Sequence, residues 1–301
     1  MSSRSPTRRA SYLPFLVPSA LLFTGVIALP LVANVAVSFT RWTGVGRPRW
    51  IGLANYRRLL ADATFWASFR HNLALIFAMA VVPTVVGLLV SGALFDVVAK
   101  RFGPRRASLL RSCIFLPQVL PIAIAGVVWG WILHPSYGFL NEALGAVGLG
   151  SLAENWLGDP RIALASVMAI MVWIQLGYPV VIFMAGQQRV DPELYEAAEL
   201  DGASWWRRLW HITVPQLRPE IYAVLLTCTV AALKVFPQIY VLTRGGPGGA
   251  TIVPSYFSFQ NFFERAAVGY GSAIATVLTA IIVALTAAFL WAQGRQERGE
   301  R

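Results

Sequence analysis

The amino-acid sequence alternates between long apolar runs and short polar segments. An α-helix rises about 1.5 Å per residue, so about 20 apolar residues are needed to cross the hydrocarbon core of a membrane. The pattern predicts an all-α integral membrane protein with six transmembrane helices. The six runs cover residues 13–39, 71–98, 109–133, 162–185, 221–242 and 270–292.

The first run follows several arginines, as the apolar part of a signal peptide does. It is too long for a signal peptide and lacks a clear cleavage site of small residues, so we interpret it as a retained anchor helix. The predicted organisation is an N-terminal tail (1–12), a six-span domain (13–293) and a C-terminal tail (294–301). A polar loop at 187–218 separates the fourth and fifth spans.

The distribution of Lys and Arg predicts the orientation, because positively charged loops stay on the cytoplasmic side. With both tails inside, the cytoplasmic segments hold fifteen of these residues and the opposite side holds nine. The loop at 187–218 is then cytoplasmic. The first outer loop is an exception to the rule, since it contains six arginines: Arg41, Arg47, Arg49, Arg57, Arg58 and Arg70.

Composition agrees with a membrane protein, because 56% of the residues are hydrophobic and only 13% are charged. The formal charge of +11 does not indicate nucleic-acid binding, since the arginines are spread over short segments and not gathered on one amphipathic face. Cys113 and Cys228 lie in apolar runs without the spacing of a disulfide framework or a zinc site. We interpret both as core residues.

The polar loop at 187–218 has the signals of a helix, a sharp turn and a second helix. Asp191 and the proline after it form an N-cap with proline at the first helical position. Gly202 suits a left-handed residue at the end of this helix. Ser204 can cap a second short helix rich in tryptophan and arginine, and Pro215 is expected to stop it.

Two interpretations of this hairpin follow from the residues alone. Tryptophan and arginine are common in the headgroup layer, so an amphipathic hairpin lying on the membrane is one of them. The other is a docking element, because the same residues are favoured anchors in protein interfaces and a rigid hairpin can transmit movement from a partner to the adjoining spans.

The loop resembles the EAA loop of binding-protein-dependent ABC importer permeases. The match includes Glu196, Ala197 and Ala198, then Gly202, and finally the segment 212–215, with valine where the family usually has leucine. In this family the loop forms a coupling helix that inserts into a groove on a cytoplasmic ATPase. The resemblance implies that the coupling residues of this chain are Glu196, Ala197, Ala198, Asp201, Gly202, Ile212 and Pro215.

Other segments are similar to the carbohydrate-uptake branch of that family. WIGLANYRRLL at 50–60 resembles the element before the second span of sugar permeases. The segments 233–251 and 269–273 resemble the first of two paired permeases of the maltose and glycerol-phosphate type. Two residues depart from the pattern: Pro237 stands where an acidic residue is frequent, and Arg244 where glycine is.

The resemblance implies a permease subunit of an ATP-binding-cassette importer in a bacterial or archaeal cell membrane. With a sister permease it would form the path for a sugar, with an oligosaccharide as the expected form. A cytoplasmic ATPase dimer would bind ATP and Mg, and an extracytoplasmic solute-binding protein would dock on the outer loops at 40–70, 134–159 and 243–269.

The chain shows no signal of chemistry of its own, so we expect no enzyme activity, bound cofactor or metal. A P-loop requires a lysine after its glycines, and the glycine-rich run at 245–249 has none. His71, His134 and His211 are widely separated and lack metal-ligand spacing.

Five residues are candidates for the translocation path. Lys234 lies about halfway along the fifth run, where an ionisable group is costly and usually functional. Gln238 and Tyr240 follow it, and Gln175 with Tyr178 could line a facing wall from the fourth span. The alternatives are an ammonium paired with a backbone carbonyl at a helix break, and amide and aromatic groups that serve helix packing.

A self-sufficient secondary transporter or channel is the competing function. Such proteins often place paired carboxylates within the membrane. Here Asp96 lies near the end of a run and Glu220 at a boundary. The scarcity of intramembrane carboxylates favours the importer subunit.

Overall fold

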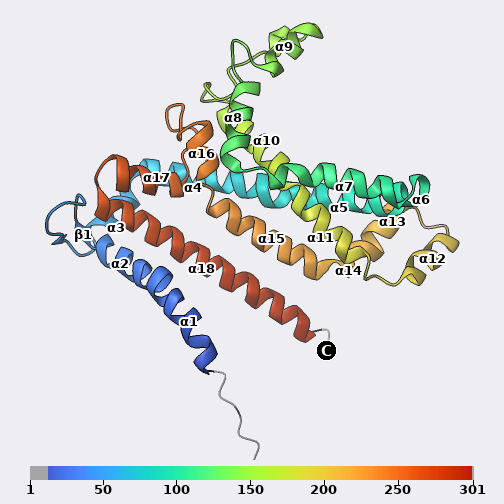
Figure 1. Ribbon diagram of the computed structural model, residues 1–301, viewed down its shortest axis with the longest axis horizontal. Helices are drawn as coiled ribbons and strands as arrows, with labels where there is room; N and C mark the ends of the chain where they lie inside the picture. The colour runs from blue at the N-terminus through green and yellow to red at the C-terminus, as the bar shows by residue number, and fades with distance from the viewer. Residues whose placement is uncertain (1–12, 300–301) are drawn as a thin grey trace, which may run out of the picture.

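The computed structural model describes residues 13–299, so the predicted tail at 1–12 lies outside the described residues. Helices make up most of this part of the chain. Figure 1 shows a bundle of long helices from which an arm containing α8 and α9 projects at one place and the hairpin of α12 and α13 at another. The strands in the described part form one short antiparallel hairpin, β1 (Thr40–Arg41) and β2 (Arg49–Trp50).

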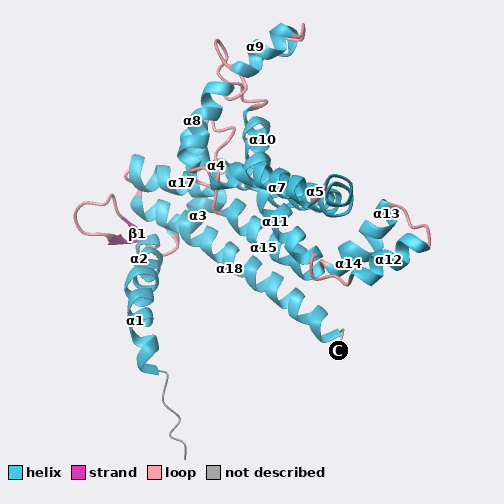
Figure 2. Ribbon diagram, turned by 45° about the vertical axis from the view of Figure 1, so that its right-hand side comes forward, coloured by secondary structure: helices cyan, strands magenta, loops and turns pink. Residues whose placement is uncertain are grey.

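The first helix lies on the outside of the bundle and agrees with the first predicted span. It consists of three consecutive segments: α1 (Leu13–Phe23), η1 (Thr24–Ala28) and α2 (Leu29–Ser38). None of its most apolar window is buried within the chain. Figures 1 and 2 both show α2 beside α18 (Val268–Gly299), and there the Asn34 amide donates to the Thr276 hydroxyl over 3.1 Å.

The second helix begins earlier than the apolar run at 71–98. After the short α3 (Ala54–Ala61), one helix of 40 residues extends from Ala63 to Phe102. Asp62 caps it, since its Oδ1 accepts hydrogen bonds from the backbone N–H groups of Thr64 and Phe65. Its segments are α4 (Ala63–Ile76), η2 (Phe77–Val81), α5 (Val82–Gly92), η3 (Ala93–Val98) and α6 (Ala99–Phe102).

The third apolar run is divided. The expectation of one helix over 109–133 is wrong, because α7 (Pro104–Val119) and α8 (Ile122–Ile132) meet at an angle of 97°. Pro121 has no N–H to continue the helix, and it forces Leu120 into an extended conformation with ψ of 134°. The bend directs α8 toward the projecting arm seen in Figure 2.

The arm is held together by one asparagine. The Asn141 amide donates to the backbone carbonyl of Glu154 over 3.0 Å, and its Oδ1 accepts from the Trp156 indole N–H over 2.7 Å. The helical parts of the arm are α9 (Phe139–Ala146) and η4 (Gly150–Leu152). These bonds give the loop a defined shape outside the bundle.

The remaining runs form two long helices and one interrupted helix. The fourth, from α10 (Ala163–Gln175) into α11 (Gly177–Gln187), agrees with the prediction of 162–185. The sixth, α18, continues to Gly299, so most of the predicted C-terminal tail is helical. The run at 221–242 is divided into two pieces, α15 (Arg218–Leu233) and α16 (Pro237–Leu242).

Four described helices are long and apolar enough to cross a membrane, or five when the bent pair of α7 and α8 is taken as one span. Within residues 13–299, α15 with 16 residues is too short by that measure, because Pro237 prevents a continuous helix into α16. The chain therefore has the helices of an integral membrane protein, and the sixth span stays a prediction.

The core lies where α4, η2, α10, α15 and α18 meet. Cys228 on α15 is buried there, as predicted. Cys113 on α7 is exposed, so its interpretation as a core residue is wrong. An apolar run contains both core-facing and lipid-facing positions, and hydrophobicity does not distinguish them. Large buried side chains of the core include Leu75, Val167, Ile170, Phe183, Ile239, Phe257 and Ile274.

Close packing of α11 on α7 depends on Gly177. A Cβ at this position would lie 2.7 Å from the Phe115 Cα and 2.8 Å from the Ile114 carbonyl oxygen, both backbone atoms. Small residues allow such an approach between membrane helices. The bent third segment is thereby held against the fourth span.

We expect Gly177→Val to lower the free energy of unfolding by about 1–3 kcal/mol, because the added side chain forces α7 and α11 apart. The measurement is the midpoint of thermal unfolding of the purified chain in detergent. Gly130→Val on α8 is the matched control, since a Cβ there meets nothing within 4 Å. Equal midpoints for the two variants would contradict the packing argument.

Candidate functional site: the cytoplasmic-loop hairpin and the break after α15

The polar loop folds into the predicted helix, turn and helix. α12 (Pro192–Leu200) begins after Asp191, whose carboxylate accepts from the Glu193 N–H over 3.0 Å. Gly202 has a φ of 70°, in the region that glycine adopts without strain. α13 (Trp205–Arg208) follows, capped by the Ser204 hydroxyl. We call the segment from α12 to α14 the hairpin.

The second arm of the hairpin is longer than predicted. It continues from α13 through η5 (Leu209–Thr213) to α14 (Val214–Gln216), so the expectation that Pro215 stops the helix is wrong by one residue. In η5 the Val214 N–H donates to the Leu209 carbonyl, one residue further back than in an α-helix. Such a wider turn accommodates a proline that lacks its own N–H.

The residues expected to contact an ATPase lie together on the hairpin. Glu196, Ala197, Asp201 and Gly202 are exposed, and Ala198, Ile212 and Pro215 are half-buried. Ala198, Asp201 and Ile212 line one cavity of about 330 Å³ between the two arms, with Arg207, Arg208 and His211 on its wall. A partner side chain fits into such a cavity.

One exposed apolar residue was missed from the sequence. Leu200, at the end of α12, is 90% exposed. Trp206 and Trp210 on the second arm are about half exposed as well. Large apolar side chains on an otherwise charged tip are typical anchors of a protein interface. Leu200 could have been found from its position just before the turn glycine.

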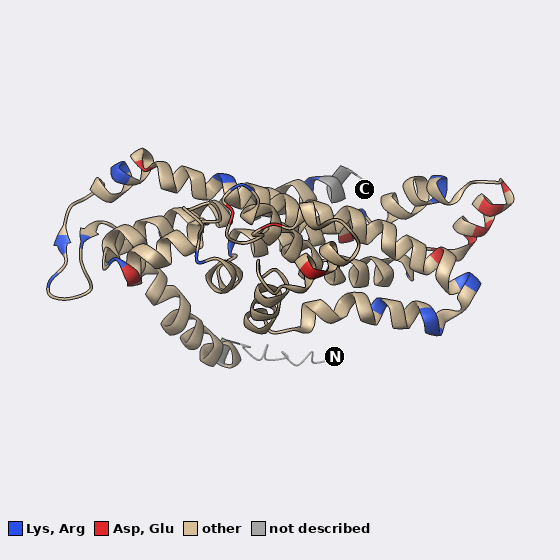
Figure 3. Ribbon diagram, turned by 90° about the horizontal axis from the view of Figure 1, so that it is seen from above, with Lys and Arg blue, Asp and Glu red and all other residues tan. Residues whose placement is uncertain are grey.

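Four charged residues join the hairpin to the end of the second helix. The Lys100 Nζ lies 2.6 Å from Glu199 and 3.7 Å from Asp96. The Arg208 Nη2 lies 3.4 Å from Glu199 and 3.6 Å from Asp96. We call these four residues the charge cluster. Figure 3 shows acidic and basic residues gathered at this end of the molecule.

Burial differs within the charge cluster. The side chains of Asp96 and Arg208 are only 7% and 13% exposed, so this pair is shielded from water. The hydrogen bond from Lys100 lowers the pKa of Glu199. Sequence spacing indicates only the pair Asp96 and Lys100, four residues apart on one helix. The other contacts require the hairpin to fold back.

Packing strengthens the attachment of the hairpin. The Tyr195 hydroxyl on the first arm lies 3.0 Å from the Thr213 hydroxyl on the second. Burial raises the pKa of Tyr195. Leu209 and Trp205 cover Gly92, where an added Cβ would lie 3.0 Å from the Leu209 Cδ1. The two arms therefore move as one body with the end of α5.

The break after α15 places three of the predicted path residues. Lys234 ends α15 and is exposed, and its ammonium forms no hydrogen bond or ion pair with residues 13–299. The negative end of the helix dipole favours this charge. Gln238 is buried at the start of α16 with its Oε1 unpaired, and Tyr240 is 37% exposed.

The two candidates from the fourth span lie elsewhere. The Gln175 amide donates to the Cys228 Sγ over 3.1 Å. Tyr178 packs beside Phe183 and Val224. Both therefore contribute to packing against α15, and the structure does not place them with Lys234.

An aromatic cluster surrounds the break. The ring centroids of Phe236 and Tyr240 lie 4.9 Å and 5.6 Å from that of Phe259, and Tyr256 lies 6.2 Å from Phe236. Phe259 and Tyr256 come from α17 (Pro254–Phe259), which continues into η6 (Gln260–Glu264). A neighbouring cavity of about 380 Å³ is lined by Phe236, Ser255, Ser258, Phe259, Phe262 and Phe263.

The structure explains one departure from the family pattern. Arg244, which stands where glycine is frequent, has a φ of 50°. That left-handed conformation suits glycine and costs other residues about 1–2 kcal/mol. The Arg244 guanidinium lies 5.7 Å from the centroid of the Tyr240 ring. A cation is thus added to the aromatic cluster where the usual glycine would add none.

Comparison with known proteins gives a family match over most of the chain. Residues 97–301 match the model of the binding-protein-dependent transport system inner membrane component. The probable ABC transporter permease protein PH1215 of Pyrococcus horikoshii is 34% identical over 297 residues, which is 97% of this chain and 100% of that protein.

Two further relatives have sugar substrates in their names. The sulfoquinovosyl glycerol transport system permease protein SmoG of Agrobacterium fabrum is 33% identical, over 91% of this chain and 87% of its own length. The trehalose/maltose transport system permease protein MalF of Thermococcus litoralis is 34% identical, over 88% of this chain and 87% of its own.

The fold also occurs in a solved structure. A chain of a bacterial ABC transporter that imports the acidic polysaccharide alginate superposes with a TM-score of 0.80 at 21% identity, covering 95% of this chain and 94% of that one. A second structure of an alginate transporter, in complex with a periplasmic protein that holds an alginate pentasaccharide, gives a TM-score of 0.79 at 19% identity, over 92% of this chain and 91% of that one.

Proposed function

We propose a transport function from the premise that this chain belongs to the family of binding-protein-dependent transport system inner membrane components. The chain is the permease subunit of an ATP-binding-cassette importer for a sugar. The observation behind the mechanism is the hairpin, which exposes Glu196 and Gly202 at its tip and is fixed to the second helix by the charge cluster.

The proposed topology has six spans with both termini in the cytoplasm of a bacterial or archaeal cell. The domain boundaries are those of a permease domain at 13–293 between two short tails. The bent pair of α7 and α8 is then the third span, and α15 with α16 is the fifth. A break in a span is tolerated where it lies against protein or lines a water-filled path. The aromatic cluster is such a place.

The partners of this subunit are a sister permease, an ATPase dimer and an extracytoplasmic solute-binding protein. The first helix is apolar and unburied within the chain, which suits contact with a sister permease as well as with lipid. ATP and Mg belong to the ATPase dimer, and this chain is not an enzyme. The α8–α9 arm and the β1–β2 hairpin offer surfaces to the solute-binding protein.

Coupling takes place at the hairpin. Ala197 and Ala198 allow a partner backbone to approach closely, and Glu196 presents a carboxylate to a basic or amide group. Leu200 is an apolar anchor. Because the charge cluster fixes the hairpin to the second helix, a displacement of the hairpin by the ATPase moves that helix with it.

The sugar path passes the break after α15. Sugar hydroxyls bind to amide and ammonium groups, and their apolar faces stack on aromatic rings. Lys234, Gln238 and Tyr240 offer these groups together. Gln175 and Tyr178 stay candidates only through a rearrangement of α10 and α11.

We expect Tyr240→Ala to raise the sugar concentration for half-maximal uptake about fivefold, because one stacking contact is lost. Tyr240→Phe keeps the ring and is expected to stay within about twofold of the wild type. The measurement is initial uptake of labelled sugar by cells that express each variant in equal amounts. An unchanged half-maximal concentration for the alanine variant would remove Tyr240 from the path.

Copurification tests the proposed function directly. The tagged chain is expected to retain an ATPase subunit after solubilisation in mild detergent, and a variant with Glu196, Ala197 and Gly202 altered together is expected to lose it. A wild-type chain that retains no ATPase and still transports in a sodium or proton gradient would support the secondary transporter in its place.

The substrate can be identified through the binding protein. Thermal unfolding of the solute-binding protein encoded beside this chain should shift upward only with its ligand, because a ligand that binds the native state stabilises it. An oligosaccharide is the expected hit. A polyol or a phosphate ester as the only hit would change the substrate class and leave the ATP-driven mechanism in place.

A further inference from the structure

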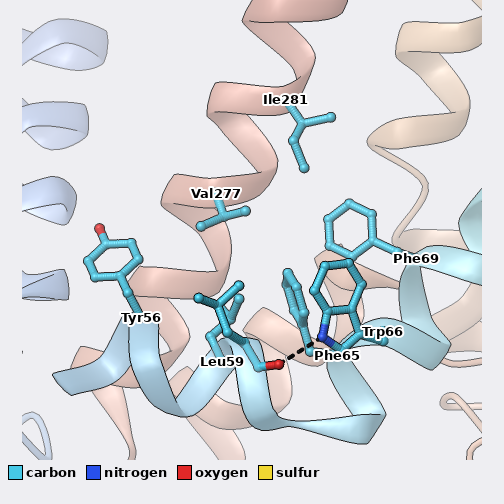
Figure 4. A pocket seen from close by; sticks show the side chains of 8 residues that line it. Tyr56, Leu59, Phe65, Trp66, Phe69, Val277 and Ile281 are labelled. Carbon is cyan, nitrogen blue, oxygen red and sulfur yellow. Dashed lines mark hydrogen bonds between the residues drawn. The ribbon is translucent and has the colours of Figure 1, made fainter. Parts of the chain in front are cut away.

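Two adjoining cavities lie between α3, the start of α4 and α18, at the end of the molecule opposite the charge cluster. One is polar and has a volume of about 510 Å³; three arginines line it, Arg41, Arg58 and Arg265. The other is apolar and has a volume of about 210 Å³. Figure 4 shows Leu59, Phe65, Trp66, Phe69, Val277 and Ile281 around the apolar cavity.

The two cavities follow one another along the same helices. On α3, Arg58 lines the polar cavity and the next residue, Leu59, lines the apolar one. On α18, Tyr270 lines the polar cavity, and Val277 and Ile281 line the apolar one. Positions seven and eleven residues apart lie on one helix face, so the apolar cavity begins about 10 Å further along α18. Together they form a continuous groove with a basic end.

The arginines at the basic end have no acidic partner in the described part of the chain. None of Arg41, Arg58 and Arg265 forms an ion pair with residues 13–299, and all three are exposed. Arg58 is held in place, because its guanidinium lies 4.0 Å above the centroid of the Tyr270 ring. The basic end therefore offers several guanidinium donors to an anion.

The Asp62 carboxylate beside this site is already occupied. Its Oδ2 accepts a hydrogen bond from the Tyr270 hydroxyl over 2.7 Å, and its Oδ1 caps α4. These bonds fix the Tyr270 ring on which Arg58 stacks. They leave the positive charge of the arginines available to a ligand.

The apolar part of the groove is open to the surroundings of the bundle. Leu60 is 65% exposed and Trp66 is 51% exposed. The Trp66 indole N–H donates to the Leu60 carbonyl over 2.9 Å, so the ring has no free donor and its face is an apolar wall. Tryptophan at this position is typical of the boundary between headgroups and acyl chains.

We propose that this groove binds a membrane phospholipid with an anionic headgroup. The phosphate lies between Arg58, Arg265 and Arg41, and an acyl chain fills the apolar cavity beside Val277 and Ile281. Neither cavity alone identifies the ligand, but a basic end joined to an apolar groove at the membrane boundary matches this amphipathic molecule. The site is independent of the proposed transport function.

The proposal also gives a reason for the arginines of the first outer loop. That loop has six of them on the side where the charge rule expects few, and two of the six, Arg41 and Arg58, line the polar cavity. Charge that binds a lipid phosphate is neutralised within the membrane boundary. It then opposes the predicted orientation less than six free arginines would.

Native mass spectrometry of the full-length chain, with the subunits that it retains, tests the site. The chain is reconstituted in vesicles of equal parts phosphatidylcholine and phosphatidylglycerol and then released in mild detergent. We expect wild-type chain to retain phosphatidylglycerol in preference to phosphatidylcholine. Arg58→Gln and Arg265→Gln should each lower the retained fraction about fivefold.

Matched variants separate the site from general effects. Arg57→Gln removes the neighbouring charge on α3, which does not line the cavity, and is expected to retain the lipid. Ile281→Trp fills the apolar cavity and should lower retention, whereas Val283→Trp, on the exposed face of α18, should not. Equal loss in Arg57→Gln and Arg58→Gln would overturn the site.

Two other ligands give different results. Inorganic phosphate that binds the wild type and Ile281→Trp equally, with no retained lipid, would mean a phosphate site without an acyl groove and overturn the lipid assignment. Unchanged lipid retention in Arg58→Gln, together with weaker capture of the solute-binding protein, would assign the arginines to an acidic protein surface and also overturn it.

Discussion

Gly202→Trp is expected to abolish uptake while membrane insertion and subunit assembly stay intact. Gly202 lies at the exposed turn of the hairpin, and a Cβ added there meets no atom of this chain within 4 Å. The bulk of a tryptophan therefore points away from the permease and toward the surface that docks there. A blocked interface anchor costs about 2 kcal/mol or more, so we expect uptake to fall by more than about tenfold.

Gly202→Ala is the control for this prediction. Both substitutions have to adopt the φ of 70°, which costs an L-residue about 1–2 kcal/mol of local strain, but only tryptophan obstructs a partner. Labelled-sugar uptake and retention of the ATPase subunit are measured for both variants at equal expression. Normal uptake by the tryptophan variant would refute the coupling role, and equal losses in both would attribute the effect to the backbone.

The second large effect is expected from Arg208→Gln. This change leaves Asp96 buried with Lys100 at 3.7 Å as its remaining partner, and it removes the bond from the Arg208 Nη1 to the Ala203 carbonyl. Loss of partners by a buried charge costs about 1–3 kcal/mol. We expect uptake per ATP hydrolysed to fall about tenfold, because a loosened hairpin no longer moves the second helix.

Neutralising both members of the buried pair should recover part of this loss. In Asp96→Asn with Arg208→Gln no charge is left unpaired, and such neutral replacements are often tolerated. Arg105→Gln on α7 is the charge control, because Arg105 is exposed. The measurements are uptake and ATP hydrolysis by the reconstituted complex. If Arg105→Gln and Arg208→Gln reduce the ratio equally, the charge cluster has no specific part in coupling.

Local sequence signals predicted the hairpin well. The cap at Asp191, the left-handed Gly202 and the cap at Ser204 depend on neighbouring residues only, and all three agree with the structure. Pro215 was misjudged because a wider helical turn before it accommodates the missing N–H. The charge cluster could not be predicted, since Asp96 and Arg208 are brought together only by tertiary folding.

The candidate path shows the opposite balance. Lys234, Gln238 and Tyr240 are close in sequence, so local reasoning grouped them correctly near one break. Gln175 and Tyr178 belong to another helix, and their direction depends on how α10 and α11 pack. The structure turns them toward Cys228 and Val224. The aromatic ring of Phe259 reaches Tyr240 from a segment that sequence patterns did not single out.

The sequence by itself determined that this protein lies in a membrane, where its apolar helices begin and end to within a few residues, and which loop has the EAA pattern. These properties depend on composition and on neighbouring residues. Tertiary structure decided which face of each helix is covered. The first span has none of its apolar window buried and the fourth has half, although both are apolar throughout. The physical reason is that lipid and protein core select the same side chains, so only packing distinguishes a residue such as Cys113 from one such as Cys228.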